Sequence, residues 1–535
     1  MTQAARPLTR PDARGPDPEE RPHAAPAPSA AGPGAPWWRG LTAPGRLLAV
    51  LHGAMLLLVA AFTFMIVRLP WIGDMGVHAA TIERLRHDLT DPGNPMVNAD
   101  TTSPYYSPWM FVLGVLAKAT GFNTFNILRF AAVVGLALLL TGIWHFTRTL
   151  TRHRAAPPLA VFCVMFLWGP QFFVWSGFLA WTSLSLNVSY PSTFTTGLGF
   201  HFLALLTKAL RRGTDTGWAA YTGLGLLWAV IMLSHQFSGV VVTFGAMGVL
   251  AGARPWPAKG TWLKLGAALA AGLALLALWP YYSFFSLFSV GGLEDIHWSL
   301  YNSDLFLRYC FALIGVAALA SRWWKDRRDP LVVWFLLALA MVVAGGLLEK
   351  WSWGRAEPAV VIPAQIAAAV AVVESGKKLV RVLFGTAVGI GLVFGVWAQN
   401  DAFGFILRKD ALPKSVTEGA WQAGPTYYWT TKYAEYGDVF MTDQKTAEML
   451  PGYGGYTIVA GYPDFFLPDE QQRAADTKRY FDKATPRRER LDILHRYGAD
   501  WVLQWPDHGG LPADDPALRK VKKGPNGQVL YKVVG

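Results

Sequence analysis

Charged residues are scarce in this chain. Of its 535 residues, 16% are charged and 52% are hydrophobic, whereas about 25% of an ordinary soluble domain is charged. The apolar excess is concentrated in blocks about as long as the ~20 helical residues that cross a bilayer. Four of these blocks are 47–69, 130–146, 331–348 and 380–398. The composition excludes an ordinary soluble protein and favours a helical protein with many membrane crossings.

Cysteine and several site motifs are also scarce or missing. The two cysteines, Cys163 and Cys310, lie in apolar blocks and have neither metal-ligand spacing nor a disulfide framework. The sequence shows no internal repeat, and residues 400–535 contain no glycine-rich phosphate loop and no convincing nucleophile triad. The net charge of +12 comes from short basic clusters between apolar blocks, which report membrane orientation. We therefore expect the lipid bilayer, and no nucleic acid, as a partner.

The N-terminal segment 1–46 is predicted to be a cytoplasmic tail. Residues 1–36 are rich in Pro, Ala and charge, which is typical of a disordered segment. No cleavable signal is visible around the first apolar block. We expect the membrane domain to begin at residue 47 and to end at residue 399.

The number of crossings depends on the short apolar segment 108–121, which contains Lys118. Without that segment, about eleven transmembrane helices remain. They are predicted at 47–69, 126–147, 158–176, 194–210, 217–233, 237–253, 262–280, 304–321, 329–348, 358–375 and 380–398.

Basic residues between the second and eleventh spans support this count. Sixteen fall in alternate loops, and only Lys350 and Arg355 fall in the others. The sixteen are Arg148, Arg152, Arg154, Lys208, Arg211, Arg212, Arg254, Lys259, Lys264, Arg322, Lys325, Arg327, Arg328, Lys377, Lys378 and Arg381. Counting 108–121 as a span would place all sixteen outside, against the positive-inside rule. We predict a plasma-membrane protein with a cytoplasmic N-terminus and segment 108–121 along the outer surface.

Residues 400–535 are predicted to form a small extracytoplasmic α/β domain, because charge rises and long apolar runs end there. It is interpreted as a structural or acceptor-docking cap. The predicted strands are 438–442, 456–460 and 501–505, with a hairpin around 523–533, and the predicted helices are 445–450, 469–482 and 487–497.

The first outer loop, 70–125, is the longest region between spans and carries two candidate site residues. Asp74 follows the first span closely and is expected to act as a general base or to hold a divalent cation such as Mg²⁺ or Mn²⁺. Its alternative role is to cap a helix over 75–89. His78 lies one turn further on, as a substrate ligand or as an ordinary interfacial histidine, and these two residues alone do not indicate zinc.

Four further polar or aromatic positions are substrate-binding candidates. Tyr105 and Tyr106 open segment 108–121, as interfacial anchors or as a wall for a sugar or lipid. His235 interrupts an apolar hairpin, and polar groups near membrane depth usually face a cavity or a partner. Asp295 belongs to a polar cluster with Glu294 and His297, and each of the three is either solvated or functional.

Arg355 lies in a predicted outer loop, although the positive-inside rule places most basic residues in cytoplasmic loops. A guanidinium suits bidentate recognition of a phosphate. The alternative is a salt bridge to Glu349 or Glu357.

The order of these parts resembles the GT-C superfamily of membrane glycosyltransferases. It is similar to the branch of protein O-mannosyltransferases and aminoarabinose transferases, and to actinobacterial cell-envelope enzymes. The resemblance is carried by Pro-x-x-Gly-Asp at 70–74, Ser-Pro-Tyr-Tyr-Ser-Pro-Trp at 103–109, Arg355 in a late outer loop and the terminal α/β domain.

The resemblance implies a fold, an activity and roles. It implies an inverting glycosyltransferase that moves a sugar from a polyprenyl-phosphate donor to a cell-envelope glycan, lipid or protein. Asp74 would be catalytic, and Arg355, with Lys350, would bind the donor phosphate. Many members have Asp-Glu where this chain has Asp74-Met75, so metal dependence stays open. Two alternatives remain: a transporter or flippase of a lipid-linked saccharide, although polar residues within the spans are sparse, and a non-catalytic cell-wall-binding scaffold.

Overall fold

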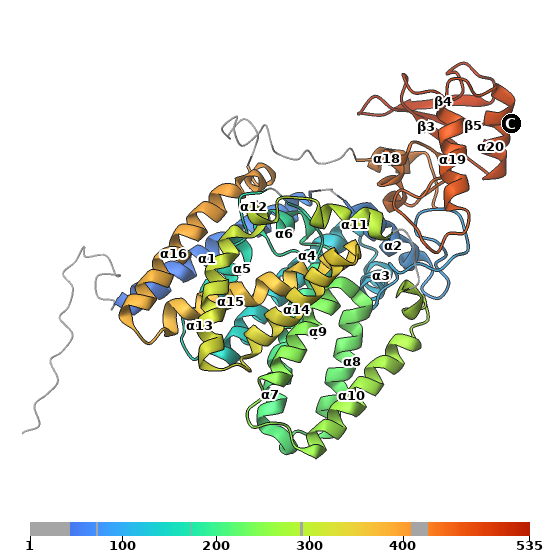
Figure 1. Cartoon of the computed structure of the whole chain (residues 1–535). Coiled ribbons are helices and arrows are strands. Elements are labelled where there is room, and N and C mark those ends of the chain that lie inside the picture. The colour runs from blue at the N-terminus through green and yellow to red at the C-terminus, as the bar shows by residue number, and fades with distance from the viewer. Residues whose placement is uncertain (1–42, 71–72, 172, 289–292, 408–425, 535) are drawn as a thin grey trace, which may run out of the picture. The chain divides into compact units, whose positions relative to one another are not determined.

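The computed structural model describes residues 43–70, 73–171, 173–288, 293–407 and 426–534 (Figure 1). The chain divides into two units, Met1–Val50 and Leu51–Gly535. Of the first unit the structure describes only the opening turns of α1, so most of the predicted tail lies outside the described residues. The contacts reported below lie within the second unit.

Apolar helices make up most of the described chain, which is a multi-pass membrane protein. Seven described helical segments are long and apolar enough to cross a membrane. They are α1 (Ala43–Arg68), α4 (Thr124–Leu150), α10 (Lys259–Ala277), α12 (Leu305–Tyr309) with α13 (Leu313–Lys325), α14 (Pro330–Leu347), α15 (Glu357–Glu374) with the preceding turn η5 (Trp351–Ala356), and α16 (Lys378–Ala398). The total of about eleven crossings stays a prediction.

Further helices lie between and beside these segments. Four are shorter and apolar: α3 (Pro108–Thr120), α5 (Ala156–Phe166), α8 (Trp218–Ser234) and α9 (Gln236–Ala251). The others are α2 (Met75–His87), α6 (Trp181–Asn187), α7 (Pro191–Arg212) and α11 (Leu293–Tyr301).

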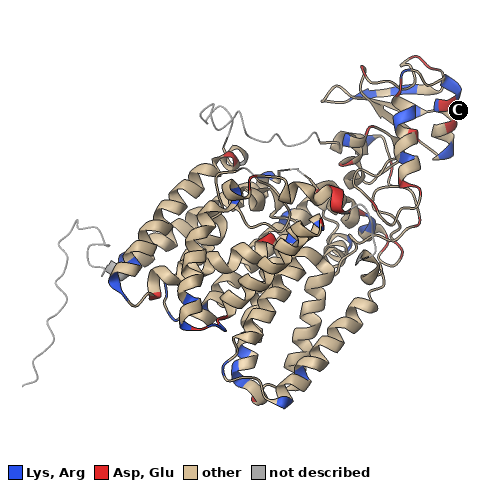
Figure 2. Ribbon diagram, in the orientation of Figure 1, with Lys and Arg blue, Asp and Glu red and all other residues tan. Residues whose placement is uncertain are grey.

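The basic loops gather at one end of the helices (Figure 2). There, Arg211 donates to the carbonyl of Thr149 at the end of α4, at 2.6 Å, and Arg254 pairs with Asp326 before α14, at 3.1 Å. The loops with few basic residues meet at the opposite ends of the same helices. This spatial sorting follows the alternation of charge in the sequence. The side of the membrane that each end faces stays a prediction.

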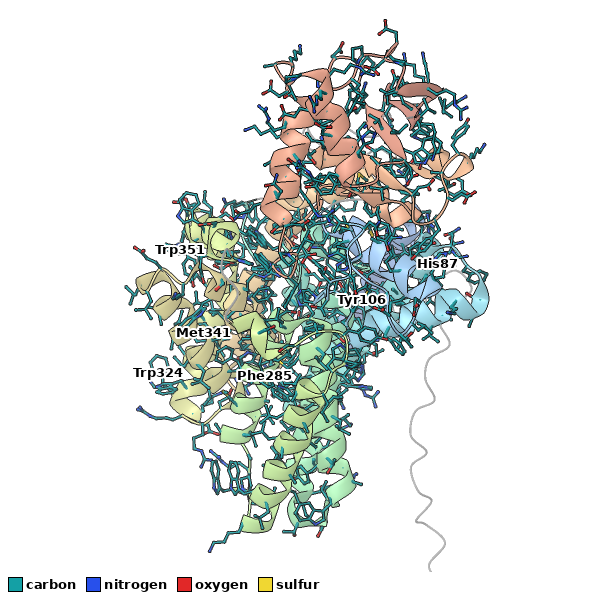
Figure 3. The ribbon with its side chains drawn as sticks, turned by 90° about the vertical axis from the view of Figure 1, so that its right-hand side faces the viewer. His87, Tyr106, Phe285, Trp324, Met341 and Trp351 are labelled. Atoms are coloured by element: carbon teal, nitrogen blue, oxygen red, sulfur yellow. The ribbon has the colours of Figure 1, made fainter. Side chains whose placement is uncertain are left out.

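Hydrogen bonds join both ends of α3 to other segments of the chain. The carbonyl of Tyr106, before α3, accepts a hydrogen bond from Trp279 Nε1 at 2.9 Å. At the other end, Lys118 Nζ donates to the carbonyl of His87 at 3.1 Å, and the His87 ring stacks on Tyr436 of the C-terminal domain. Figure 3 labels His87 and Tyr106 in this region. The position of α3 along the outer membrane surface stays a prediction.

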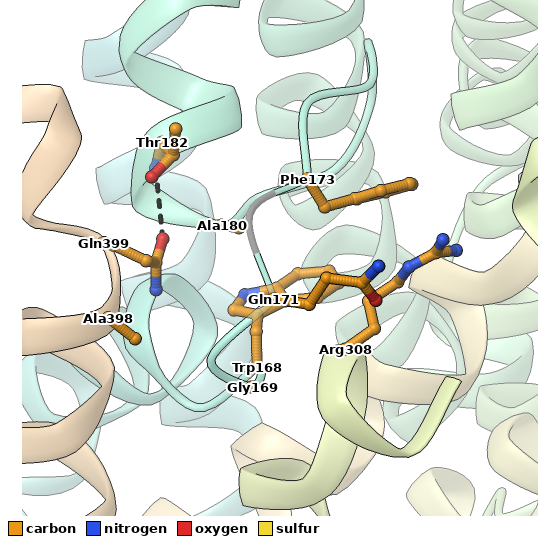
Figure 4. Close-up of a pocket in the computed structure, with 9 residues that line it drawn as sticks. All are labelled: Trp168, Gly169, Gln171, Phe173, Ala180, Thr182, Arg308, Ala398 and Gln399. Carbon is orange, nitrogen blue, oxygen red and sulfur yellow. Dashed lines mark hydrogen bonds between the residues drawn. The ribbon is translucent and has the colours of Figure 1, made fainter. Parts of the chain in front are cut away.

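The predicted span at 158–176 is wrong, because α5 ends at Phe166. Non-helical backbone at membrane depth is tolerated only where its polar groups are satisfied within the protein. Two buried glutamines supply those partners: Gln365 Nε2 donates to the carbonyl of Leu167 at 2.9 Å, and Gln399 Nε2 donates to that of Met165 at 3.1 Å. Figure 4 shows the small pocket around this break, including the hydrogen bond from Thr182 to Gln399.

The C-terminal domain contains a five-stranded sheet in the order β2-β1-β3-β5-β4. β1 pairs in parallel with β2 and β3, and β5 pairs antiparallel with β3 and β4. The predicted α/β domain is therefore present, although the second strand is much shorter than 456–460. The elements are β1 (Val439–Met441), α18 (Gln444–Ala447), β2 (Tyr456–Thr457), α19 (Glu470–Phe481), α20 (Arg487–Arg496), β3 (Trp501–Gln504), β4 (Leu518–Lys523) and β5 (Val529–Val533).

A buried arginine of α2 joins the first loop to this domain. Arg84 is fully buried, and it donates to the carbonyls of Gly454 at 2.9 Å and Gly455 at 2.5 Å. Its guanidinium also lies over the Tyr456 ring, 3.6 Å from the centroid. The domain is thereby held against the loop that carries Asp74.

Candidate functional site

Asp74 stands immediately before α2, and its carboxylate forms no hydrogen bond with the helix backbone. The alternative role as a capping side chain is therefore not used in this structure. The preceding Gly73 has φ +50°, a conformation that glycine adopts without strain. This turn separates Asp74 from the end of α1 and leaves the carboxylate available for other partners.

Aromatic side chains surround Asp74. The Asp74 charge and burial raise the pKa values of Tyr105 and Tyr190, so both phenols lie within its electrostatic reach. Tyr190 immediately precedes α7, whereas Tyr105 belongs to the same loop as Asp74. Two segments far apart in the sequence thus meet at this carboxylate.

His78 lies between the same two tyrosines. Its ring contacts those of Tyr105 and Tyr190 edge-on, with centroid distances of 5.7 and 4.7 Å. The side chain is 6% exposed, and Nδ1 has no hydrogen-bond partner among the described residues. Burial lowers the pKa of His78 to about 3, so the imidazole is neutral and keeps an unused hydrogen-bonding group at the site.

Arg355 is buried with its charge unpaired among the described residues. Its guanidinium lies over the rings of Trp175 and Phe237, 4.9 and 4.5 Å from their centroids. It is 6% exposed, and Nε has no hydrogen-bond partner in the part of the chain that the structure describes. A buried guanidinium without an anion is costly, and its planar donors suit a phosphate.

The predicted alternative salt bridges of Arg355 do not form. Glu357 instead pairs with buried Arg308 at 3.4 Å and accepts a hydrogen bond from the Tyr309 hydroxyl. Glu349 is exposed. Arg355 therefore remains free to bind an anion that is not part of the described chain.

The structure brings Asp74 and Arg355 to the same site. Burial raises the pKa of Asp74, and the positive charge of Arg355 opposes that rise. The pair combines a carboxylate whose proton affinity is increased with a guanidinium that is within reach of the Asp74 and Glu357 charges but forms no ion pair with a described residue. Such a pair can take a proton from one reactant while it stabilises negative charge on another.

His235 lies on the Arg355 side of the site. Its Nδ1 accepts a hydrogen bond from the backbone N–H of Ser238 at 3.1 Å, so Nε2 carries the proton and donates to Ser176 Oγ at 3.3 Å. Burial and the nearby Arg355 lower the pKa of His235. The imidazole is neutral, and both nitrogens are engaged, so it positions Ser176 without adding charge.

Three predicted site residues are not brought to this cluster. Lys350 and Asp295 are exposed. Tyr106 is buried on another side, where its pKa responds to burial and Arg84 rather than to Asp74.

Trp175, Phe237 and Tyr190 were not predicted from the sequence as site residues. Of the polar cluster Glu294, Asp295 and His297, the predicted substrate-binding candidate was Asp295. His297, rather than Asp295, packs on Trp175 and Phe237, with centroid distances of 5.3 and 5.4 Å. On α11, His297 and Leu300 are buried while Asp295 is exposed. A helix predicted over 293–301 would have indicated that His297, and not Asp295, shares a face with Leu300.

The residues near Asp74 do not form a recognisable metal centre. Among the described residues, no group of three or more His, Cys, Asp or Glu side chains is arranged to hold a metal ion. We assign no step to a metal. Dependence on Mg²⁺ or Mn²⁺ stays a prediction.

Comparisons with known proteins identify the fold. No family model matches the sequence, and no curated protein matches it. Among solved structures, ArnT from Cupriavidus metallidurans bound to undecaprenyl phosphate matches with a TM-score of 0.52 and 14% identity, over 90% of this chain and 98% of ArnT.

A second match is the arabinofuranosyltransferase AftD from Mycobacteria. Its TM-score is 0.52 and its identity 15%, over 92% of this chain but only 40% of AftD. This chain thus corresponds to less than half of the length of AftD. The described helices and the terminal domain have the fold of the GT-C membrane glycosyltransferases.

Proposed function

We propose that this protein is a membrane glycosyltransferase. It transfers a sugar from a polyprenyl-phosphate donor to a cell-envelope glycan, lipid or protein on the outer face of the membrane, with inversion at the anomeric carbon. The observation that carries the proposal is that Asp74 lies within electrostatic reach of Arg355, which is buried and forms no ion pair with another described residue. The structurally similar ArnT binds undecaprenyl phosphate, which agrees with a lipid-phosphate donor.

Each residue has a defined step in this reaction. Asp74 accepts the proton of an acceptor hydroxyl while the oxygen of that hydroxyl forms a bond to the anomeric carbon of the donor sugar. The bond from that carbon to the phosphate oxygen breaks, and its electron pair leaves on the polyprenyl phosphate. Arg355 stabilises the negative charge that develops there. Attack from the face opposite the phosphate gives inversion, and the proton passes from Asp74 to solvent.

The aromatic surroundings support the same step. The guanidinium of Arg355 lies over the rings of Trp175 and Phe237, and these rings would exclude water from a phosphate bound to Arg355. An electrostatic interaction is stronger in such an environment than in water.

The direct test is an in vitro transfer assay with purified protein and a panel of polyprenyl-phosphate sugars. We expect release of polyprenyl phosphate together with a glycosylated acceptor. Movement of the intact lipid-linked saccharide between leaflets, without bond cleavage, would instead support a flippase. Glycan binding with no reaction of any donor would support a scaffold.

A further inference from the structure

The C-terminal domain contacts the backbone on both sides of Asp74. The Tyr462 hydroxyl donates to the carbonyl of Gly73 at 2.5 Å. Two residues after Asp74, Gly76 lies directly against the backbone of Glu448, and a β-carbon on Gly76 would approach the Glu448 carbonyl to 1.6 Å. Only glycine allows this approach. Asp74 is thus bracketed by two contacts with the same domain.

Glu448 presents a second carboxylate beside Asp74. It is partly buried, and no hydrogen bond or ion pair of its carboxylate forms within the described chain. Burial raises the pKa of Glu448, the Lys445 charge opposes that rise, and the Asp443 and Asp74 charges add to it. Nearby, His78 Nδ1 is buried and has no hydrogen-bond partner among the described residues. The loop and the C-terminal domain therefore each supply an unused hydrogen-bonding group near Asp74.

The charge of the site is divided. On one side of Asp74 lie Arg355 and the rings that hold it. The C-terminal domain contributes the carboxylates of Glu448, which Lys445 only partly offsets, and of Asp464, which accepts a hydrogen bond from Asn94 at 2.6 Å. The basic side suits a phosphate, whereas the acidic side repels one.

We propose that Glu448 and Tyr462 form the acceptor subsite, and that the acceptor is a neutral, polyhydroxylated glycan. This inference rests on the proposed function. Glu448 accepts hydrogen bonds from sugar hydroxyls next to the reacting one, which then lies at Asp74. Tyr462 is a positioning residue, because its hydroxyl holds the Gly73 turn. Hydrogen bonds to an ionised carboxylate are stronger than neutral ones, and a carboxylated acceptor is disfavoured by the charge already present.

The experiment measures two bindings and one reaction in full-length protein. The acceptor probes are a neutral oligomannoside and a neutral oligoarabinofuranoside, with a hexuronate oligosaccharide of equal length for comparison. The donor-site probe is undecaprenyl phosphate. The variants are Glu448→Gln, which keeps the side-chain shape, Glu448→Asp, which keeps the charge, and the control Glu435→Gln, at an exposed glutamate of the same domain.

We expect at least one neutral glycan to bind and the hexuronate to bind more weakly. Glu448→Gln should weaken neutral-glycan binding, and raise the acceptor KM, by about tenfold or more, the scale of one charge-assisted hydrogen bond. Glu448→Asp should recover part of this loss. Binding of undecaprenyl phosphate should not change, and Glu435→Gln should behave like the wild type.

A wild-type acceptor KM in Glu448→Gln would overturn the inference about the acceptor subsite. It would not contradict the proposed glycosyltransferase activity. Transfer to a peptide hydroxyl, with no binding of either neutral glycan, would overturn it in favour of a protein acceptor. Neutral-glycan binding that depends on Glu448, with no transfer from any lipid donor, would support the carbohydrate subsite and contradict the proposed reaction.

Discussion

Asp74 and Arg355 come from opposite parts of the membrane domain, and the charge of Arg355 opposes the rise in the Asp74 pKa that burial causes. Each residue lacks the partner that would give it a purely structural role: Asp74 does not cap α2, and Arg355 pairs with neither Glu349 nor Glu357. The following predictions depend on this pair and on the domain that contacts it.

Arg355 should control donor affinity. Arg355→Ala should weaken binding of undecaprenyl phosphate by about tenfold or more, because a charged hydrogen-bonding partner is lost. Arg355→Lys should retain part of the affinity but not the bidentate geometry. Lys350→Ala is the comparison, because Lys350 is exposed and a small effect is expected. Unchanged donor affinity and turnover in Arg355→Ala would exclude Arg355 from donor binding.

The pH dependence of transfer should follow the ionisation of Asp74. A general base must be ionised, and burial raises the pKa of Asp74 above its ordinary value of 3.8. The rate at saturating donor should therefore fall on the acid side at a pH above 3.8. Arg355→Ala should move this acid limb to higher pH, because the charge that lowers the pKa is lost, whereas Arg355→Lys should leave it nearly in place. An acid limb that Arg355→Ala does not move would contradict the coupling.

Arg84 should determine how firmly the C-terminal domain is held. Arg84→Ala removes donors from the buried carbonyls of Gly454 and Gly455, at a cost of about 3 kcal/mol or more in unfolding free energy. Arg86→Ala is the matched control, because Arg86 is partly exposed and lies 3.7 Å from Glu83, so its loss should cost at most about 1 kcal/mol. Denaturant unfolding measures both. Equal losses would show that Arg84 does not hold the domain.

Membrane orientation can be tested with single cysteines in a chain from which Cys163 and Cys310 have been replaced. Thr102→Cys and Thr431→Cys, both at exposed positions, should react with an impermeant reagent in intact cells. Thr214→Cys, exposed at the basic end, should react only after permeabilisation. The reverse pattern would place the basic loops outside.

The sequence predicted the membrane helices where apolar runs are continuous and the α/β domain where charge rises. It did not predict the end of α5 at Phe166, because the glutamines that satisfy the freed carbonyls, Gln365 and Gln399, are distant in the chain. Local hydropathy is high on both sides of the break, so it gives no signal there.

Asp74 was predictable as a single residue because it closely follows the first span, and Arg355 because it is a basic residue in a predicted outer loop. Their neighbours were not. Glu448 and Tyr462 reach Asp74 only because the C-terminal domain packs on the first loop, and no local pattern in the sequence marks that contact.

The central claim is tested by Asp74→Asn in the transfer assay. Asn keeps the shape of the side chain and caps helices about as well as Asp, and Asp74 makes no capping bond, so the variant should fold normally. Transfer from a polyprenyl-phosphate sugar should fall about a hundredfold or more, while Asp100→Asn, at an exposed position of the same loop, should retain wild-type activity. Repeating the assay with and without Mg²⁺ or Mn²⁺ separates a metal ligand from a direct base. A folded Asp74→Asn protein that transfers sugar at the wild-type rate would contradict the account.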